Sequence, residues 1–273
     1  MPASAGNNSK FAGDIPEFYD RKLVPLLFEP YALDLAKRVA RLKPRKVLEV
    51  AAGTGVATRR LLDALPSESR ITATDLNEPM LDQARLRVGR DVRISWKQAD
   101  ALQLPFDDDC FDAVVCQFGF MFFPDKPQAM HEFFRVLTKG GHLVLNVWDS
   151  LESNPPAHIA NGVIAEFFSP DPPRFWDIPY GCHDVKELRR LTSEAGFSSI
   201  EIVTLPIEGV SPSAKDAAEG LVRGTPVANT ITERAPKKFE EIVRRTSACL
   251  AERYGASPLR IPLQAHVLTA RKV

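Results

Sequence analysis

The apolar residues of this chain gather in short continuous runs, and between these runs they recur every three or four positions. Short apolar runs bounded by turn residues are typical of strands buried on both faces, whereas the wider spacing is typical of amphipathic helices. The runs predict strands at 46–50, 70–75, 92–97, 111–117, 142–148, 199–205 and 263–271. The helical spacing predicts helices at 30–42, 56–65, 79–88, 127–137 and 184–195.

This alternation of strands and helices predicts an α/β fold with a doubly wound, seven-stranded, mostly parallel sheet. Ligands of such sheets bind outside the carboxyl ends of the strands, beside the point where the strand order reverses. We expect the helix at 127–137 to stop at Gly140 and Gly141, which would turn the chain into the next strand.

Two segments break the alternation, and we interpret them as cap insertions after the fifth and sixth strands. Residues 151–183 are rich in proline and aromatic residues, which predicts irregular structure with short helical pieces. Residues 206–260 predict helices near 213–222 and 236–254. The other residues divide between an N-terminal segment and the main domain, at 1–29, 30–150 and 184–273.

Composition narrows the classes of function. The 35 basic and 35 acidic residues cancel, which argues against non-specific nucleic-acid binding. The four cysteines are scattered, so the sequence predicts neither a metal site nor a disulfide framework. The N-terminus lacks the apolar core of a signal peptide, and no apolar run is long enough for a membrane span. We therefore expect a cytoplasmic protein without stable membrane insertion.

A glycine loop follows the first predicted strand. Glu49 ends an apolar run, and Gly53 and Gly55 lie in a stretch of small residues before a helix. This arrangement lets the backbone approach a nucleotide-like ligand at a helix N-terminus. Thr58 stands where a dinucleotide-binding loop has its third glycine, and an acid before the loop would repel a pyrophosphate. The loop therefore favours a ligand that carries positive charge.

Two further acids lie at predicted strand ends. Asp75 ends the second strand, where a carboxylate can accept hydrogen bonds from both hydroxyls of a ribose. Asp100 follows the third strand, where a carboxylate can accept from the exocyclic amine of adenine. Each acid alone is explained as a loop residue or a helix cap. Together with the glycine loop, they favour an adenosine ligand.

These motifs, in this order, make the chain resemble a class I S-adenosylmethionine-dependent methyltransferase. It is most similar to the small-molecule methyltransferases of type 11, the group that includes the ubiquinone and menaquinone C-methyltransferases. The resemblance runs from residue 46 to 148 and returns more weakly from 180 to 205. It is carried by Val47–Gly55, Asp75–Leu81, Asp100–Phe106, Arg135–Gly141 and Ala195–Phe197. It implies the Rossmann-like methyltransferase fold, with S-adenosylmethionine as cofactor and S-adenosylhomocysteine as product.

The resemblance implies roles on the methionine side of the cofactor. Glu49, Ala51 and Gly53 would line the methionine part, Gly55 would complete the loop, and Gln117 would face the sulfonium. Ala51 stands where the family has glycine, and the loop tolerates this residue if the Ala51 φ is negative.

The resemblance also implies roles on the adenosine side. Asp75 would bind the ribose hydroxyls, with Leu76 and Met80 against the adenine ring, and Asp100 and Ala101 would bind the adenine edge. The N-terminal segment would lie over this cofactor site.

Aromatic residues mark the acceptor side of the expected site. Tyr19, Phe118, Phe122 and Trp148 are candidate substrate contacts, although an aromatic run after a strand is also explained as hydrophobic core. Ligand pockets are mostly apolar, so these residues favour a small apolar or aromatic acceptor.

Methyl transfer is an in-line displacement in which positioning supplies most of the catalysis, and a base is needed only if the acceptor must lose a proton. His158 and His183 lie in or beside the first insertion and are the catalytic candidates, whereas His266 is expected to be structural.

Two other readings stay open. One is an NAD-dependent oxidoreductase on a similar fold, which would have a third loop glycine and a Tyr-x-x-x-Lys pair. The other is a non-catalytic homologue that still binds the cofactor. The acceptor molecule, its accepting atom and the oligomeric state are not determined by the sequence.

Overall fold

A computed structural model describes residues 15–273 of the chain; the part of the predicted N-terminal segment that precedes Ile15 lies outside the described residues. The strands are β1 Lys46–Val50, β2 Arg70–Asp75, β3 Ile94–Gln98, β4 Phe111–Gln117, β5 Leu137–Trp148, β6 Ser198–Ser211 and β7 Leu259–Arg271. The α-helices are α1 Ile15–Phe18, α2 Glu29–Leu42, α3 Val56–Ala64, α4 Glu78–Val88, α5 Lys126–Val136, α6 Pro155–Phe167, α7 Val185–Glu194, α8 Ala214–Arg223, α9 Val227–Arg234 and α10 Phe239–Tyr254. Other helical segments are the π-helical η1 Tyr19–Phe28 and the 3-10 turns η2 Phe120–Phe122, η3 Phe175–Asp177 and η4 Pro236–Lys238.

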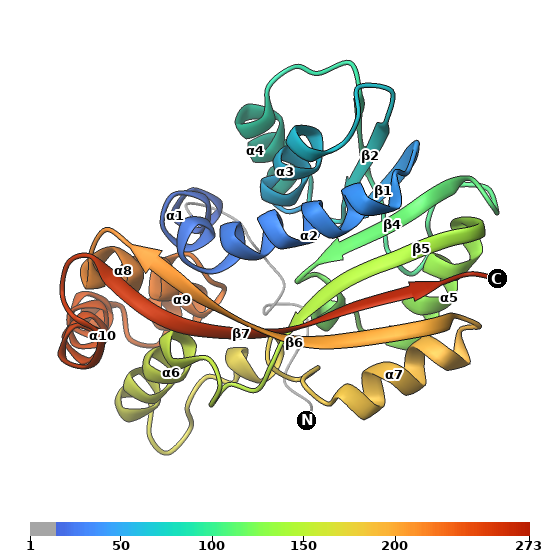
Figure 1. Cartoon of the computed structure of the whole chain (residues 1–273). Helices are drawn as coiled ribbons and strands as arrows, with labels where there is room; N and C mark the ends of the chain where they lie inside the picture. The colour runs from blue at the N-terminus through green and yellow to red at the C-terminus, as the bar shows by residue number, and fades with distance from the viewer. Residues whose placement is uncertain (1–14) are drawn as a thin grey trace. The chain divides into compact units, whose positions relative to one another are not determined.

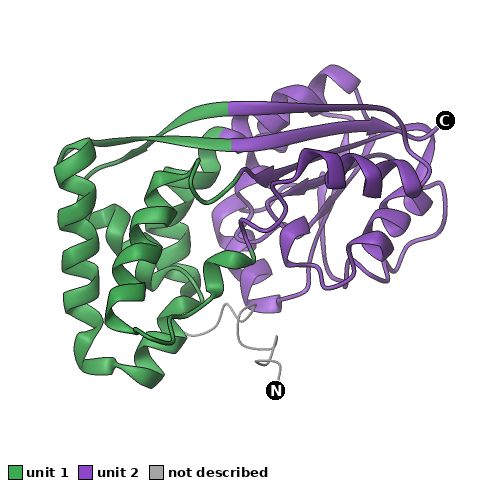
Figure 2. Ribbon diagram, turned by 90° about the horizontal axis from the view of Figure 1, so that it is seen from below, with its two compact units in different colours: residues 1–30, 150–178, 206–264 green, residues 31–149, 179–205, 265–273 purple. Residues whose placement is uncertain are grey.

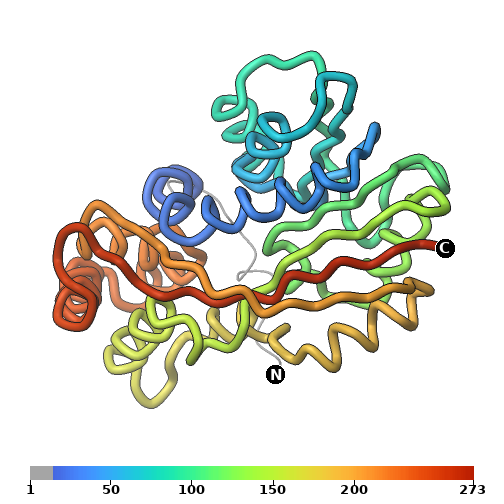
Figure 3. Tube along the Cα trace, viewed as in Figure 1, coloured from blue at the N-terminus to red at the C-terminus, as the bar shows by residue number. Residues whose placement is uncertain are grey.

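The seven strands form one sheet in the order β3-β2-β1-β4-β5-β7-β6 (Figure 1). The pairs from β3 through β5 are parallel, and β7 runs antiparallel to β5. The coloured trace in Figure 3 shows the last strand, β7, between β5 and β6. The predicted fold class is therefore confirmed, and the strand order reverses between β1 and β4, where a doubly wound sheet binds its ligand.

The central strands make the core of the sheet. In β1 every residue after Lys46 is buried, and the middle of β4 is equally shielded. Burial on both faces explains why these strands read as continuous apolar runs in the sequence. The helices α3 and α4 pack on each other, as do α5 and α7.

The chain divides into two compact units, which Figure 2 distinguishes by colour. The sheet unit consists of 31–149, 179–205 and 265–273, and the helical unit consists of 150–178, 206–264 and the residues before Tyr31. Residues 179–183, assigned to the first insertion from the sequence, thus fall in the sheet unit. That the helical segments cap a cofactor site stays a prediction.

Helices α6, α8 and α10 pack together within the helical unit, and η1 packs on α8. Lys22 of η1 forms ion pairs with Asp216 and Glu219 of α8. Asn154 joins the start of α6 to β7, because its side chain exchanges hydrogen bonds of 3.0 Å with the backbone of Gln264.

Several predicted elements differ from the structure. β5 begins at Leu137, directly after α5, so Gly140 and Gly141 do not end the helix. The register against β4 shifts between Phe111 and Ala113, which places the two glycines in an irregular part of the strand. A bulge of this kind can require one residue with a left-handed backbone, for which glycine is suited. Gly140 is that residue here, with a φ of 86°.

Two other differences involve proline, at the end of the sixth strand and at the start of α6. Pro206 was expected to end the sixth strand, yet β6 continues to Ser211. β6 is an edge strand, and proline is tolerated in edge strands because half of their N–H positions face away from the sheet. Residues 151–183 were expected to hold irregular structure with short helical pieces, but Pro155 and Pro156 begin the 13-residue helix α6, where proline is favoured.

Candidate active site

Four polar side chains share one face of the sheet at the carboxyl ends of the central strands. In a sheet, paired residues point to the same face, and alternate residues of a strand return to that face. The register of β1 with β2 and β4 places Glu49, Asp75 and Gln117 on one face. Gln117 pairs directly with Asn146 of β5. The structure therefore brings together three of the predicted cofactor residues, with one additional amide.

The glycine loop between β1 and α3 is held by backbone hydrogen bonds. Ala52 donates to the Thr74 carbonyl at 2.8 Å, and Gly55 donates to the Ala52 carbonyl at 3.0 Å. Gly55 has a φ of 80°, and a Cβ there would lie 3.0 Å from the Cβ of Ala84 in α4. Glycine is therefore needed at this position for both the turn and the close packing of α4.

Asp75 connects the loop to the end of β2. One carboxylate oxygen accepts the N–H of Gly53 at 2.9 Å, and the other accepts the N–H of Asn77 at 2.9 Å. The residue is buried, and this burial raises the pKa of Asp75 despite the hydrogen bonds from Asn77 and Gly53. The carboxylate is thus oriented by the loop beside which a ribose would lie.

Glu49 is a buried acid, and one of its carboxyl oxygens lacks a hydrogen-bond partner among residues 15–273. Its side chain is 1% exposed, and Oε2 makes no hydrogen bond within residues 15–273. Burial raises the pKa of Glu49 to about 8, and this effect outweighs the opposing hydrogen bonds from Thr58. A buried carboxyl that lacks a partner is destabilising. The arrangement therefore suits a ligand that brings a cationic donor to Oε2.

The remaining adenosine-side candidates surround the ends of β2 and β3. Leu76 is exposed, whereas Met80 and Ala101 are buried. Asp100 is exposed, and its side chain accepts the N–H of Leu102 at 2.9 Å. An apolar side chain and an acid are thus accessible on the two segments that the sequence assigns to adenine.

The φ of Ala51 is positive, contrary to the negative value that the sequence analysis required. The loop was expected to tolerate alanine at a negative φ, but Ala51 has a φ of 57°. L-residues other than glycine rarely adopt this left-handed region, because their Cβ approaches the carbonyl oxygen. Alanine is therefore strained here.

Phe118 and Trp148 form the centre of an aromatic cluster in the sheet unit. Their rings stack at a centroid distance of 3.9 Å, and Tyr31 of α2 meets both rings edge-on at 5.3 Å. Trp148 also stacks on Tyr180 at 6.1 Å. Both predicted substrate residues are buried in this cluster. Phe118 has a φ of 52°, a strained conformation of the kind that concentrates at functional sites.

The other acceptor-side candidates are divided between the units. Tyr19 and His158 lie in the helical unit, whereas Phe122 and His183 lie in the sheet unit. The ring of Tyr19 lies 5.1 Å from that of Phe28, and Phe122 is half-buried in η2. His158 is exposed on α6. The structure does not test their roles in substrate binding or catalysis, which stay predictions.

His183 and His266, both in the sheet unit, differ in burial. His183 is exposed, and its Nδ1 contacts the Tyr180 carbonyl at 2.8 Å. His266 is buried in β7, with Nδ1 3.0 Å from the Thr204 hydroxyl and Nε2 3.2 Å from a carboxylate oxygen of Asp149. Because both ring nitrogens of His266 are engaged, the structure agrees with the structural role expected for it.

Sequence reasoning missed Asn146. Its side chain is fully buried, and neither its Oδ1 nor its Nδ2 has a hydrogen-bond partner within residues 15–273. Buried amides are normally paired, so an unpaired one calls for an explanation. A single polar residue inside the apolar run 143–148 was the signal that could have identified it.

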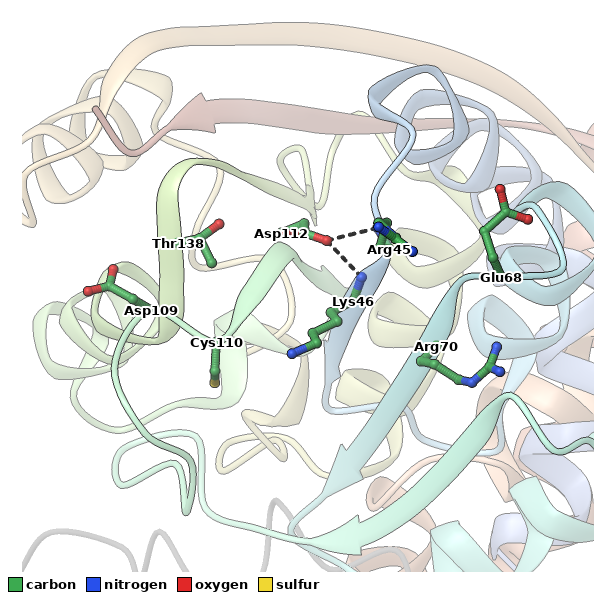
Figure 4. A pocket seen from close by; sticks show the side chains of 8 residues that line it. All are labelled: Arg45, Lys46, Glu68, Arg70, Asp109, Cys110, Asp112 and Thr138. Atoms are coloured by element: carbon green, nitrogen blue, oxygen red, sulfur yellow. Dashed lines mark hydrogen bonds between the residues drawn. The ribbon is translucent and has the colours of Figure 1, made fainter.

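A separate pocket lies at the opposite end of the sheet. It has a volume of about 460 Å³ and opens at the amino ends of β1, β2 and β4 (Figure 4). Its lining residues are Arg45, Lys46, Glu68, Arg70, Asp109, Cys110, Asp112 and Thr138. Asp112 accepts the backbone N–H groups of Arg45 and Lys46 at 2.8 and 2.9 Å. This mixed-charge pocket is remote from the glycine loop and takes no part in the candidate site.

In the part of the chain from Ile15 onward, no three His, Cys, Asp or Glu side chains are grouped so that they could hold a metal ion. No helix of that same part is both long and apolar enough to cross a membrane.

Comparison with curated proteins identifies relatives of about half of the chain. The demethylmenaquinone methyltransferase of Deinococcus radiodurans is 42% identical over 126 residues, which cover 46% of this chain and 50% of the relative. The ubiquinone/menaquinone biosynthesis C-methyltransferase UbiE of Idiomarina loihiensis is 33% identical over 132 residues, covering 45% and 49%. The chain therefore spans about half the length of the curated relatives it matches.

A solved structure extends the likeness of the fold to the whole chain. A phosphoethanolamine N-methyltransferase of Haemonchus contortus matches with a TM-score of 0.64 at 15% identity, covering 99% of this chain and 61% of that protein. The family model of the methyltransferase domain matches residues 47–141, which contain the glycine loop, Asp75, Asp100 and Gln117. The segment 47–141 of this chain therefore matches the methyltransferase-domain family, in agreement with the resemblance that its sequence motifs carry.

Proposed function

We propose that this chain transfers the methyl group of S-adenosylmethionine to a small apolar or aromatic acceptor by in-line displacement. One observation carries the proposal: Glu49, Asp75 and Gln117 share one sheet face around a left-handed glycine loop. Ligands of doubly wound sheets bind at this edge. The curated relatives are named as methyltransferases, and this supports the same reaction for this chain.

The donor set fits the cofactor. The unpartnered Oε2 of Glu49 matches the cationic amino group of a methionine moiety, because an ammonium supplies the hydrogen bond and the opposite charge that the carboxylate lacks. Asp75 would accept the ribose hydroxyls, with Leu76 and Met80 against adenine. Asp100 and Ala101 would bind the adenine edge. The backbone of Ala51, Gly53 and Gly55 would follow the methionine part.

When bound, S-adenosylmethionine supplies an activated methyl group on a sulfonium. The task of the protein is then to hold the acceptor in line with that methyl group and to exclude water, which can supply most of the rate enhancement. Gln117 ends β4 at the face shared with Glu49, and we propose that it faces the sulfonium. A proton acceptor is required only for an acceptor that ionises. His158 and His183 remain the proposed candidates for that role.

The acceptor class rests on the aromatic side chains near this edge and on the names of the relatives. Phe118 and Trp148 stack in the sheet unit, and Phe122 follows them in η2. These three side chains would contact a planar ring. The related enzymes are named for demethylmenaquinone and ubiquinone or menaquinone. We therefore propose a quinol-like or other aromatic ring as the acceptor, bound as a small molecule rather than as part of a nucleic acid.

A radiochemical assay tests this function. The full chain is incubated with S-adenosylmethionine labelled in the methyl group and, separately, with a demethylated naphthoquinol, a simple phenol and a fatty acid. We expect label in the organic extract with a ring acceptor and none when Asp75 is replaced by asparagine. Absence of transfer to every ring acceptor, with the cofactor bound, would contradict the proposed acceptor class. Absence of cofactor binding would contradict the function itself.

A further inference from the structure

The glycine loop and the segment after β4 meet at Ala51 and Gly119. The alanine has a backbone conformation that favours glycine, and the glycine has one that any residue can adopt. Ala51 has a φ of 57°, which favours glycine, but it carries a methyl group. Gly119 has a φ of −96° and a ψ of −37°, which any residue adopts, but it has no side chain. Conformation therefore explains neither choice.

The space between the two residues explains why one is alanine and the other is glycine. A Cβ on Gly119 would lie 2.4 Å from the Cβ of Ala51 and 3.1 Å from the Sγ of Cys116. Real Cβ atoms do not approach another carbon so closely, so glycine is required at 119 because alanine is present at 51. The Ala51 methyl group fills the space between the glycine loop and the residues that follow β4.

The segment that meets Ala51 carries the acceptor-side residues. Gln117 ends β4, and Phe118 donates its N–H to the Asn146 carbonyl at 3.0 Å. Gly119 then accepts the N–H of Phe122 at 3.0 Å, which forms the turn of η2. A displacement of Gly119 would therefore be transmitted along 117–122, which is anchored at both sides.

We propose that the Ala51 methyl group is a positioning element, which sets the distance between the glycine loop and residues 117–122. This inference rests on the proposed function, because it gives the contact the task of aligning Gln117 and Phe118 with the bound cofactor. It also explains why a strained alanine is kept: strain at a functional site is retained where the surrounding structure requires it. Ala51 acts here through Gly119 and does not need to touch the acceptor.

A double-mutant cycle tests the proposal. The variants are Ala51→Gly, Gly119→Ala, the double variant, and Gly162→Ala as the matched control. Gly162 is exposed on α6, and a Cβ there would meet no atom within 4 Å. For each full-length variant, calorimetry measures the melting temperature without ligand, and isothermal titration measures the dissociation constant of S-adenosylhomocysteine.

We expect Gly119→Ala to melt lower and to bind S-adenosylhomocysteine about tenfold more weakly, because the two methyl groups collide. The double variant moves one methyl group from residue 51 to residue 119, so both quantities should return close to those of the wild type. Ala51→Gly alone should melt no lower, because glycine relaxes the left-handed backbone, yet bind several-fold more weakly. The control should leave the dissociation constant unchanged.

Two results would overturn the proposal. One is a Gly119→Ala variant that melts and binds like the wild type; the other is a double variant no better than Gly119→Ala. If the wild type binds no S-adenosylhomocysteine, the proposed function fails, whereas the melting temperatures of the cycle still decide whether the two residues are coupled.

Discussion

Asp75 is the residue whose replacement most directly tests the adenosine side of the site. Its two carboxylate oxygens already accept N–H groups from Gly53 and Asn77, so the side chain is fixed beside the loop. Asp75→Asn removes the charge and turns one acceptor into a donor. We expect binding of S-adenosylhomocysteine to weaken by about 1.5–3 kcal/mol, the range for hydrogen bonds to charged groups. Titration calorimetry measures this change.

Asp82→Asn is the matched control for that experiment. Asp82 is exposed on α4 and forms an ion pair with Arg85, three residues away. Its replacement should leave the affinity unchanged. Equal affinities of Asp75→Asn and the wild type would remove Asp75 from the cofactor site.

Glu49 predicts a dependence of stability on pH. Burial raises the pKa of Glu49 in the folded chain to about 8, from an ordinary value of 4.5. Between these values the unfolded chain has released this proton and the folded chain still holds it. The contribution of Glu49 to stability is therefore complete below pH 4.5 and decreases as pH rises to about 8, by up to ~1.4 kcal/mol per pH unit.

The comparison with Glu49→Gln isolates this contribution. The variant cannot ionise, so its free energy of unfolding should lack this slope. Urea unfolding at several pH values measures both proteins without ligand. The difference between them should grow from pH 5 to pH 8 in favour of the variant, and then level off. A difference that does not vary with pH would show that Glu49 is ionised in the folded chain.

Asn146 predicts a gain in stability on replacement. An unsatisfied buried polar group costs about 1–3 kcal/mol, so Asn146→Leu, which keeps the branched shape, should raise the melting temperature of the unliganded chain. Thr246→Val is the matched control, because the Thr246 hydroxyl, on α10 of the other unit, is also buried without a hydrogen-bond partner among residues 15–273. A rise for Thr246→Val and a fall for Asn146→Leu would mean that a water molecule satisfies the amide.

At the level of single residues, the sequence predicted which polar side chains lie at one edge of the sheet. It did not predict the φ of Ala51 or the lack of space for a side chain at residue 119. Glu49, Asp75 and Gln117 could be placed at one edge because the ends of parallel strands meet there. The positive φ of Ala51 could not be read from its neighbours, because alanine argues against that conformation. The need for glycine at 119 depends on a contact between residues far apart in the chain, which a single sequence does not show.

At the scale of elements, α5 fixes the segment that follows Asp100. Arg135 of α5 donates to the carbonyls of Leu104 and Phe106 at 2.9 and 2.8 Å, and also pairs with Glu132. Glu132 in turn accepts the N–H of Leu104 at 2.7 Å. This network attaches the loop after β3 to a helix on the sheet.

Arg135→Lys tests this attachment. A lysine ammonium cannot reproduce the fork that spans two carbonyls, so we expect a loss of about 1–3 kcal/mol in the free energy of unfolding. Urea unfolding measures the loss. Arg190→Lys is the control, since Arg190 is exposed and pairs with two acids of its own helix α7. Equal effects of the two variants would contradict the attachment.

Strands buried on both faces were the most predictable elements. The predicted bounds of β1, β2 and β4 agree with the structure, because a continuous apolar run ends where burial ends. β6 and β7 extend further than predicted, since alternate residues of these strands are exposed. α9 was not predicted, and its sequence VANTITER contains several weak helix formers, so packing rather than propensity determines it.

At the scale of the whole molecule, the chain combines a sheet unit that carries the family motifs with a helical unit that does not. The family model matches residues 47–141, which lie within the sheet unit. Specificity for an acceptor often depends on such added segments, and this explains why the sequence predicts the cofactor class but not the acceptor molecule. The proposal that segments of the helical unit cap the site belongs to this scale.

The central claim is that the site binds the adenosyl cofactor, and calorimetric titration of the full-length chain tests it most directly. The chain is titrated with S-adenosylmethionine, S-adenosylhomocysteine and NAD under the same conditions. We predict micromolar binding of both adenosyl ligands and no binding of NAD. Binding of NAD without binding of either adenosyl ligand would contradict the account.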